Sequence, residues 1–157
     1  MKKVIAIIIL ALINITGINA QTVQEQIKTI DKQCKEIKNN IGKFKKIVKS
    51  EDSTGYKYVY MKDKELQLIS LQYKDKNIEK NVDWYVVKGK IVYCETLWIN
   101  YSTGKRIMDD KNYFNNEHMI AWIKIDGSSI DSNSKDFMDF DSQFAAYAPK
   151  LREMSMK

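Results

Sequence analysis

Residues 84–92, with the sequence WYVVKGKIV, decide the fold of this chain. Apolar and β-branched residues flank a Lys-Gly pair, which is the pattern of two strands joined by a tight turn. Residues 112–120, NYFNNEHMI, repeat the same order of aromatic strand, polar turn and aliphatic strand, and residues 60–66, YMKDKEL, form a looser copy. The sequence therefore predicts three successive hairpins, which are either a true internal repeat or separate hairpins of similar pattern.

Helical patterns stand on both sides of these hairpins. Apolar residues recur every three or four positions over residues 22–49, which predicts one long helix, and a second helix begins near Ser134, with Pro149 expected to kink or end it. We expect an α+β fold with a long N-terminal helix, an antiparallel meander of about six strands and a C-terminal helix, both helices covering one sheet face. The expected strands are residues 56–60, 66–73, 82–87, 91–101, 112–115 and 118–125.

The N-terminal segment has the layout of a secretory signal peptide. Lys2 and Lys3 precede an apolar run over residues 4–13, and small or turn-forming residues follow up to Ala20. The apolar run is shorter than the roughly 20 residues that a membrane span needs. We therefore expect residues 1–20 to be cleaved and residues 21–157 to form a single domain that is exported, periplasmic or secreted, without a membrane anchor after cleavage.

The charge of the chain gives little support to nucleic-acid binding. The formal net charge is +6, and nearly all of the basic residues are lysines, since Arg106 and Arg152 are the only arginines. Nucleic-acid sites favour arginine for its bidentate hydrogen bonding. We expect a solvated lysine surface and no nucleic-acid partner.

The two cysteines, Cys34 and Cys94, are a candidate disulfide. Export to an oxidising compartment would permit the bond, and closing a loop of about 60 residues is worth ~4 kcal/mol in the chain-entropy model. The alternative is two separate buried thiols. There is no Cys/His cluster, so the sequence predicts no zinc site and no cofactor.

The hairpin at residues 112–120 resembles those of short exported proteins of Bacteroidetes-type bacteria, whose pattern is Tyr-Tyr-Phe, an Asn/Gly turn and Lys-Leu-Ile. It also has some similarity to MORN-type hairpin repeats, although Gly89 is the only glycine in any of the turns. The resemblance covers about half of the mature chain. It implies an exported protein rich in hairpins and transfers no functional residue.

Catalytic and metal-binding patterns are weak. His118 is the only histidine, and the neighbouring Glu117 would point to the opposite face of a strand, so the two cannot easily form one site. Residues 131–136 begin like a calcium loop but carry Lys135 at the fifth position and no glycine at the sixth. Helix capping explains the acidic residues here more simply. We expect no catalytic residue and no metal site.

The long strand at residues 91–101 carries the best indication of function, because both of its faces are apolar or aromatic. If Cys34 bonds to Cys94, the first helix covers the Cys94 face, and the opposite face is free to bind. Tyrosine is enriched at protein interfaces. The residues expected on this free face are Tyr93, Leu97, Ile99 and Tyr101.

We therefore expect a non-enzymatic exported module that binds another protein, as an inhibitor or an immunity protein does. The alternative is a small-ligand or carbohydrate-binding module with a cone-shaped sheet, as in NTF2-like or cystatin-like folds. A hydrolase that uses paired carboxylates is a third candidate, since such pairs have no fixed sequence spacing.

Overall fold

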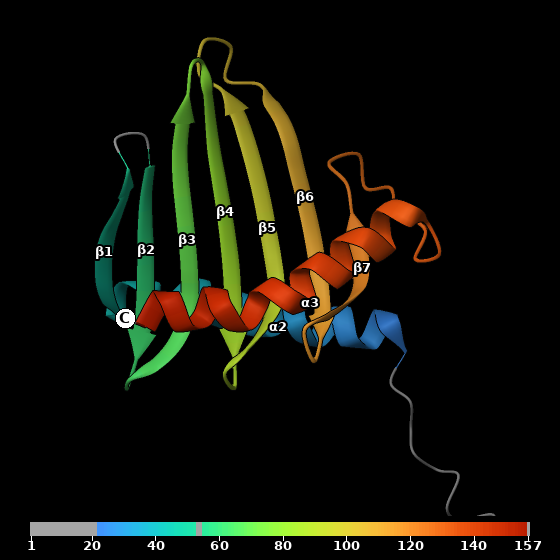
Figure 1. Ribbon diagram of the computed structural model, residues 1–157, viewed down its shortest axis with the longest axis horizontal. Coiled ribbons are helices and arrows are strands. Elements are labelled where there is room, and N and C mark those ends of the chain that lie inside the picture. Colours follow the sequence, from blue (N-terminus) through green and yellow to red (C-terminus); the bar gives the residue numbers. More distant parts are fainter. Residues whose placement is uncertain (1–21, 53–54, 157) are drawn as a thin grey trace, which may run out of the picture.

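The computed structural model describes residues 22–52 and 55–156, in which one antiparallel sheet lies between two helices (Figure 1). The strand order follows the chain from β1 to β7, so the sheet is a meander. This confirms the predicted α+β class, with one strand more than expected. The elements are α2 (Val23–Asn40), the 3-10 helix η1 (Ile41–Lys43), β1 (Lys45–Asp52), β2 (Gly55–Lys62), β3 (Glu65–Asp75), β4 (Ile78–Val87), β5 (Lys90–Asn100), β6 (Arg106–Asn115), β7 (His118–Ile123) and α3 (Lys135–Met156).

The additional strand is β1, which occupies the end of the segment predicted as helix. A capping box between Thr22 and Glu25 starts α2, but the helix ends at Asn40 and the chain turns through η1 into a strand paired with β2. The apolar residues Phe44 and Val48 happen to continue the helical spacing. A strand is favoured here because pairing with β2 satisfies backbone groups along a whole sheet edge.

The three predicted hairpins are present and share one geometry. Each turn has two central residues with positive φ, at Asp63 and Lys64, Lys88 and Gly89, and Asn116 and Glu117, as a two-residue hairpin turn of type I′ requires. Each hairpin also has a register shift at the same distance from its turn, between residues 60/61, 85/86 and 113/114. The hairpins therefore form a structural repeat.

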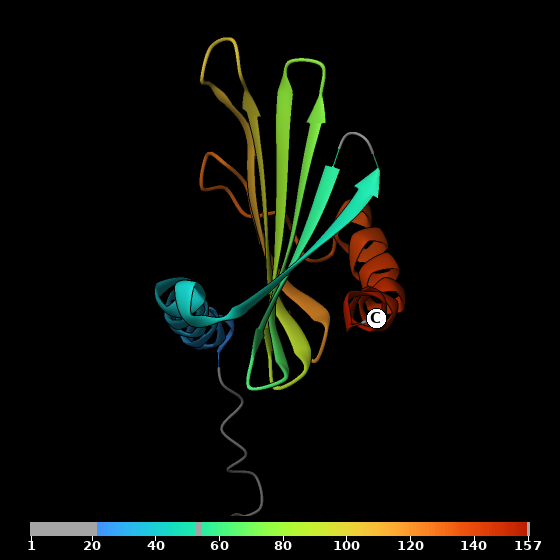
Figure 2. The ribbon, with the colours of Figure 1, turned by 90° about the vertical axis from the view of Figure 1, so that its left-hand side faces the viewer.

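The two helices cover opposite faces of the sheet, so the expectation that both cover one face is wrong (Figure 2). Ile27, Ile30, Cys34 and Ile37 of α2 share a buried cluster with tyrosines of the sheet. Residues of α3, among them Phe144, pack in a second cluster with Val86 and other aliphatic residues. Near the hairpin turns the sheet carries apolar residues on both faces, such as Tyr85 on one and Val86 on the other, so each face needs a helix to shield it from water.

Helix α3 runs through Pro149 to Met156, whereas the sequence predicted a kink or an end there. Proline in a helix costs ~3 kcal/mol. The neighbouring Ala148 and Leu151 are both almost completely buried, and their packing offsets that cost. Among the described residues, no helix is both long and apolar enough to span a bilayer.

Both helices cross the sheet near the three hairpin turns, and β3 to β6 extend well beyond them (Figure 1). We call this extension, residues 70–83 and 95–110, the outer half of the sheet. It has no helix on either face, so the candidate surfaces for binding lie here and along the margins of the helices.

Candidate functional site

The predicted disulfide is absent, and the structure explains why. Both cysteines are free and buried. Cys34 lies in the cluster beneath α2, whereas Cys94 lies in the cluster beneath α3 on the other face. The sheet itself separates the two thiols. Burial raises the pKa of each thiol to about 12, so both behave as small apolar side chains.

Without the disulfide, α2 covers the face of β5 that was expected to be free. Sequence alternation correctly places Tyr93 and Cys94 on opposite faces, but α2 covers the Tyr93 face rather than the Cys94 face. Tyr93 is only 5% exposed and stands between Tyr85 and Tyr113, with ring centroids 5.4 and 5.0 Å away. Burial raises the pKa of the Tyr93 hydroxyl. Tyr93 is therefore a core residue.

The other three residues predicted for this face lie on the outer half of the sheet. Leu97 and Ile99 are half-buried, and Tyr101 in the following turn is exposed. They stand beyond α2, and Leu97 lines a polar cavity of about 340 Å³. The structure therefore separates the predicted set into one core residue and three outer residues.

Polar groups dominate that cavity. Lys38 of α2 forms an ion pair with Glu95 at 2.8 Å, and Arg106 forms one with Asp109 at 2.7 Å. Asp83 pairs with Glu95 across β4 and β5. Desolvation raises the pKa of the Asp83 carboxyl, and the nearby Glu95 raises it further. Internal ion pairs join four of the charged side chains here, whereas Asn81 Oδ1 and Asp83 Oδ1 are buried without a hydrogen-bond partner.

The opposite face of the outer half carries an apolar groove beside α3. Its volume is about 430 Å³, and aromatic and aliphatic side chains from β4, β5 and α3 form its walls. Hydroxyl and amide groups come from Thr96, Gln143 and Tyr147, and the rest of the lining is mainly apolar or aromatic. The lining residues are Val82, Trp84, Cys94, Thr96, Phe140, Gln143, Phe144 and Tyr147.

Aromatic contacts hold the walls of this groove in place. Phe140 lies 5.3 Å from Trp122 and 6.1 Å from Phe144, measured between ring centroids. The indole N–H of Trp122 donates a hydrogen bond to the carboxylate of Asp110 at 2.9 Å. Because this bond and these rings fix the side chains, the groove exists before anything binds to it.

An aromatic platform continues the groove outward along the sheet. Trp98 lies two residues beyond Thr96 on the same face of β5 and pairs with Met108 of β6 and with Lys80 of β4. The Lys80 ammonium stands 4.9 Å from the Trp98 ring centroid, a cation–π distance. We call the groove and the platform together the α3-side surface. Strand alternation places Thr96 and Trp98 on the Cys94 face, which the expected disulfide would have put beneath the first helix.

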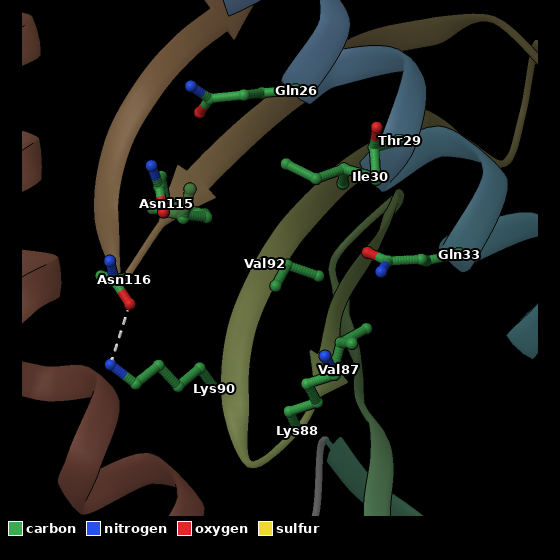
Figure 3. A pocket seen from close by; sticks show the side chains of 11 residues that line it. Gln26, Thr29, Ile30, Gln33, Val87, Lys88, Lys90, Val92, Asn115 and Asn116 are labelled. Atoms are coloured by element: carbon green, nitrogen blue, oxygen red, sulfur yellow. Dashed lines mark hydrogen bonds between the residues drawn. The ribbon is translucent and has the colours of Figure 1, made fainter. Parts of the chain in front are cut away.

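A larger cavity lies on the other side of the sheet, beneath the first half of α2 (Figure 3). Its volume is about 760 Å³, and it is open to solvent. Residues from α2 form one wall, and the ends of the β4–β5 and β6–β7 hairpins form the other. No pattern in the sequence predicts this cavity, because the cavity depends on the angle between a helix and two turns.

His118 is part of a contact between β7 and α3. Its Nδ1 atom lies 3.2 Å from Asp141 Oδ2, and the other oxygen of Asp141 accepts the backbone N–H of Met119 at 2.5 Å. The pair therefore ties the start of β7 to the first half of α3.

The acidic residues of the loop before α3 bond within that loop. Asp126 accepts the backbone N–H of Ser128, and Asp131 accepts that of Asn133. Nowhere in the described ranges do three or more His, Cys, Asp or Glu side chains converge as metal ligands. These acids shape the loop.

Comparisons with family models, with curated proteins and with solved structures found no match to this chain. Its function is therefore inferred from the geometry of the surfaces described above.

Proposed function

We propose that this protein is an exported, non-enzymatic module that binds another protein through the α3-side surface. The observation that carries the proposal is the apolar groove at the margin of α3, which opens onto the uncovered outer half of the sheet. An inhibitor or an immunity protein that neutralises a toxin works through such a surface. The predicted aromatic sheet face is thus kept as the binding element, but on the opposite side of the sheet.

The groove has the properties of an anchor site. Full burial of one Leu, Met or Phe side chain contributes ~1.5–3 kcal/mol, and a few such anchors dominate the affinity of most protein interfaces. Trp84 and Trp98 supply the aromatic area that interfaces favour. Tyr147 on α3 is 45% exposed and can close over an inserted side chain.

The same geometry favours a protein partner over a sugar. A sugar carries hydroxyl groups along its whole edge and needs several polar partners, whereas the lining of this groove is mainly apolar, with hydroxyl and amide groups from Thr96, Gln143 and Tyr147. A carbohydrate site in a cone-shaped sheet was the alternative. Here each sheet face carries its own helix, and the groove lies at a helix margin.

Export belongs to the proposal as well. The signal-peptide pattern at residues 1–20 lies outside the described residues, and it supports a periplasmic or secreted location. The partner would then be a protein of the same compartment.

Selection from a random peptide library displayed on phage tests the binding function without knowledge of the partner. The bait is the chain from residue 22 onward. We expect the enriched peptides to share one large apolar residue, flanked by residues that tolerate variation. A selection that enriches no peptide, or only peptides without an apolar anchor, would contradict the proposal.

Two variants of neighbouring residues then locate the site. Thr96→Trp fills the groove and should weaken binding of a selected peptide at least tenfold. Leu97→Trp makes a similar change on the opposite face of the same strand and should leave the affinity within about twofold. Thermal denaturation of both variants establishes that each is folded. Equal loss of binding in the two variants would place the site elsewhere.

A further inference from the structure

The cavity beneath α2 has a chemistry that the proposed function does not use. We call it the α2 trough. Figure 3 shows side chains from α2 facing the ends of two hairpins across an open space. The lining residues are Gln26, Thr29, Ile30, Gln33, Val87, Lys88, Lys90, Val92, Phe114, Asn115 and Asn116.

The floor of the trough is apolar because of a β-bulge. Tyr85 pairs with Tyr93 and Val86 pairs with Ile91, so Val92 has no partner on β4. A bulged residue turns its side chain away from the regular alternation. Val92 therefore faces α2 together with Tyr93, although strict alternation would place it on the other face. With Val87 it forms a half-buried floor of aliphatic carbon, and the buried Ile30 of α2 borders this floor.

The rim of the trough is basic and rich in amide groups. Lys88 lies in the β4–β5 turn, Lys90 begins β5, and both are exposed; the Lys90 ammonium lies 3.0 Å from Asn116 Oδ1. Neither lysine forms an ion pair with a carboxylate among the described residues. The side-chain amides of Gln33 and Asn115 add hydrogen-bond donors. None of the eleven lining residues is acidic, so the rim is complementary to an anion.

We propose that the α2 trough binds an anionic amphiphile, a carboxylate joined to an unbranched apolar chain, which is the chemistry of a fatty acid. The aliphatic floor packs against the apolar chain. The lysines and the rim amides donate hydrogen bonds to the carboxylate. A simple anion would leave the floor wet, and a neutral chain would gain nothing from the rim. Each methylene buried on the floor should raise the affinity about fourfold.

Three probes of related structure test the charge and the chain separately. Isothermal titration calorimetry of the chain from residue 22 onward would use decanoate, decyltrimethylammonium and acetate. The two ten-carbon compounds would be kept below their critical micelle concentrations. We expect decanoate to bind, more weakly as salt is added, and the other two to show no saturable binding. Equal binding of decanoate and decyltrimethylammonium would overturn the proposal, because the rim would then contribute nothing.

Paired charge variants place the carboxylate. Replacing Lys88 and Lys90 together by Gln should weaken decanoate binding roughly tenfold, since an exposed charge pair contributes up to about fivefold for each lysine. Replacing Lys28 and Lys32 by Gln removes the same charge from exposed positions of α2 that do not line the trough. This control should bind decanoate like the unaltered chain. An equal loss in both double variants would show non-specific attraction and contradict the site.

Two space-filling variants place the chain. Gln33→Trp narrows the trough from the α2 wall and should abolish decanoate binding. Thr96→Trp fills the groove on the opposite face and should leave it unchanged. The reverse result would assign decanoate to the groove beside α3 and refute the trough as its site.

Discussion

At the scale of single residues, burial decides the chemistry of this protein. Cys34 and Cys94 would be a plausible disulfide in an exported chain, yet they face different helices across a sheet. Tyr93 is of a residue type that is enriched at interfaces, but its ring packs between two other tyrosines. In both cases the residue type suggested a role, but the surroundings of the side chain depend on which helix covers which face of the sheet.

The thiols should be inert in the folded protein. With a pKa of about 12, each has almost no thiolate at pH 8, and the thiolate is the form that reacts. Iodoacetamide at pH 8 should leave both cysteines unmodified in the native state and alkylate both in denaturant without any reductant. Mass spectrometry reads this directly. Failure to alkylate in denaturant before reduction would show that a disulfide exists.

Asp83 should make stability depend on pH. Desolvation, together with the opposite Glu95, raises the pKa of this carboxyl in the folded state, so folding favours its protonated form. The contribution of Asp83 to the free energy of unfolding is therefore fully present below the ordinary pKa of an aspartate. This contribution is lost as the pH rises through the raised pKa.

The variant Asp83→Asn keeps the shape and removes this dependence. It should unfold at a higher urea concentration than the unaltered chain at pH 7, and the difference should shrink towards pH 3. Urea titrations at several pH values between 3 and 8 would measure it. A difference of the same size at every pH would contradict the assignment of the effect to ionisation of Asp83.

At the scale of elements, local patterns were predictable and long-range ones were not. The hairpins at residues 84–92 and 112–120 form as expected, because their turns and alternation lie within a few residues. Strand β1 was mistaken for helix because Phe44 and Val48 fit both periods, and only pairing with β2 decides between them. The faces of β5 were largely assigned correctly, but the helix over each face is set by connections that no local pattern encodes.

The shared turn geometry gives a test at this scale. Lys64 has a φ of 72° in the β2–β3 turn, a conformation that costs a residue with a side chain ~1–2 kcal/mol and costs glycine little. Lys64→Gly should therefore stabilise the protein by about 0.5–1 kcal/mol in urea denaturation.

The equivalent position of the β4–β5 turn already carries a glycine, Gly89, with a φ of 75°. Gly89→Ala should destabilise the protein by about 1 kcal/mol, although nothing lies within 4 Å of the added methyl group. If Lys64→Gly destabilises, or Gly89→Ala stabilises, the two turns do not share the type I′ conformation.

At the scale of the whole molecule, a helix on each face leaves the outer half of one sheet uncovered (Figures 1 and 2). One side of that outer half neutralises itself with ion pairs, and the other presents a groove and an aromatic platform. This asymmetry is why the proposed binding surface is on the side of α3. The sequence predicted the free sheet face from a bond between Cys34 and Cys94, and the structure shows these two cysteines free and beneath different helices.

Hydrogen exchange of the protein with and without a saturating selected peptide tests the α3-side surface most directly. We predict slower exchange within residues 140–147 of α3, the segment that contains the α3 residues lining the groove. Exchange over α2 (residues 23–40) should be unchanged. Slower exchange in α2 with no change in residues 140–147 would contradict it, because the partner would then occupy the opposite face of the sheet.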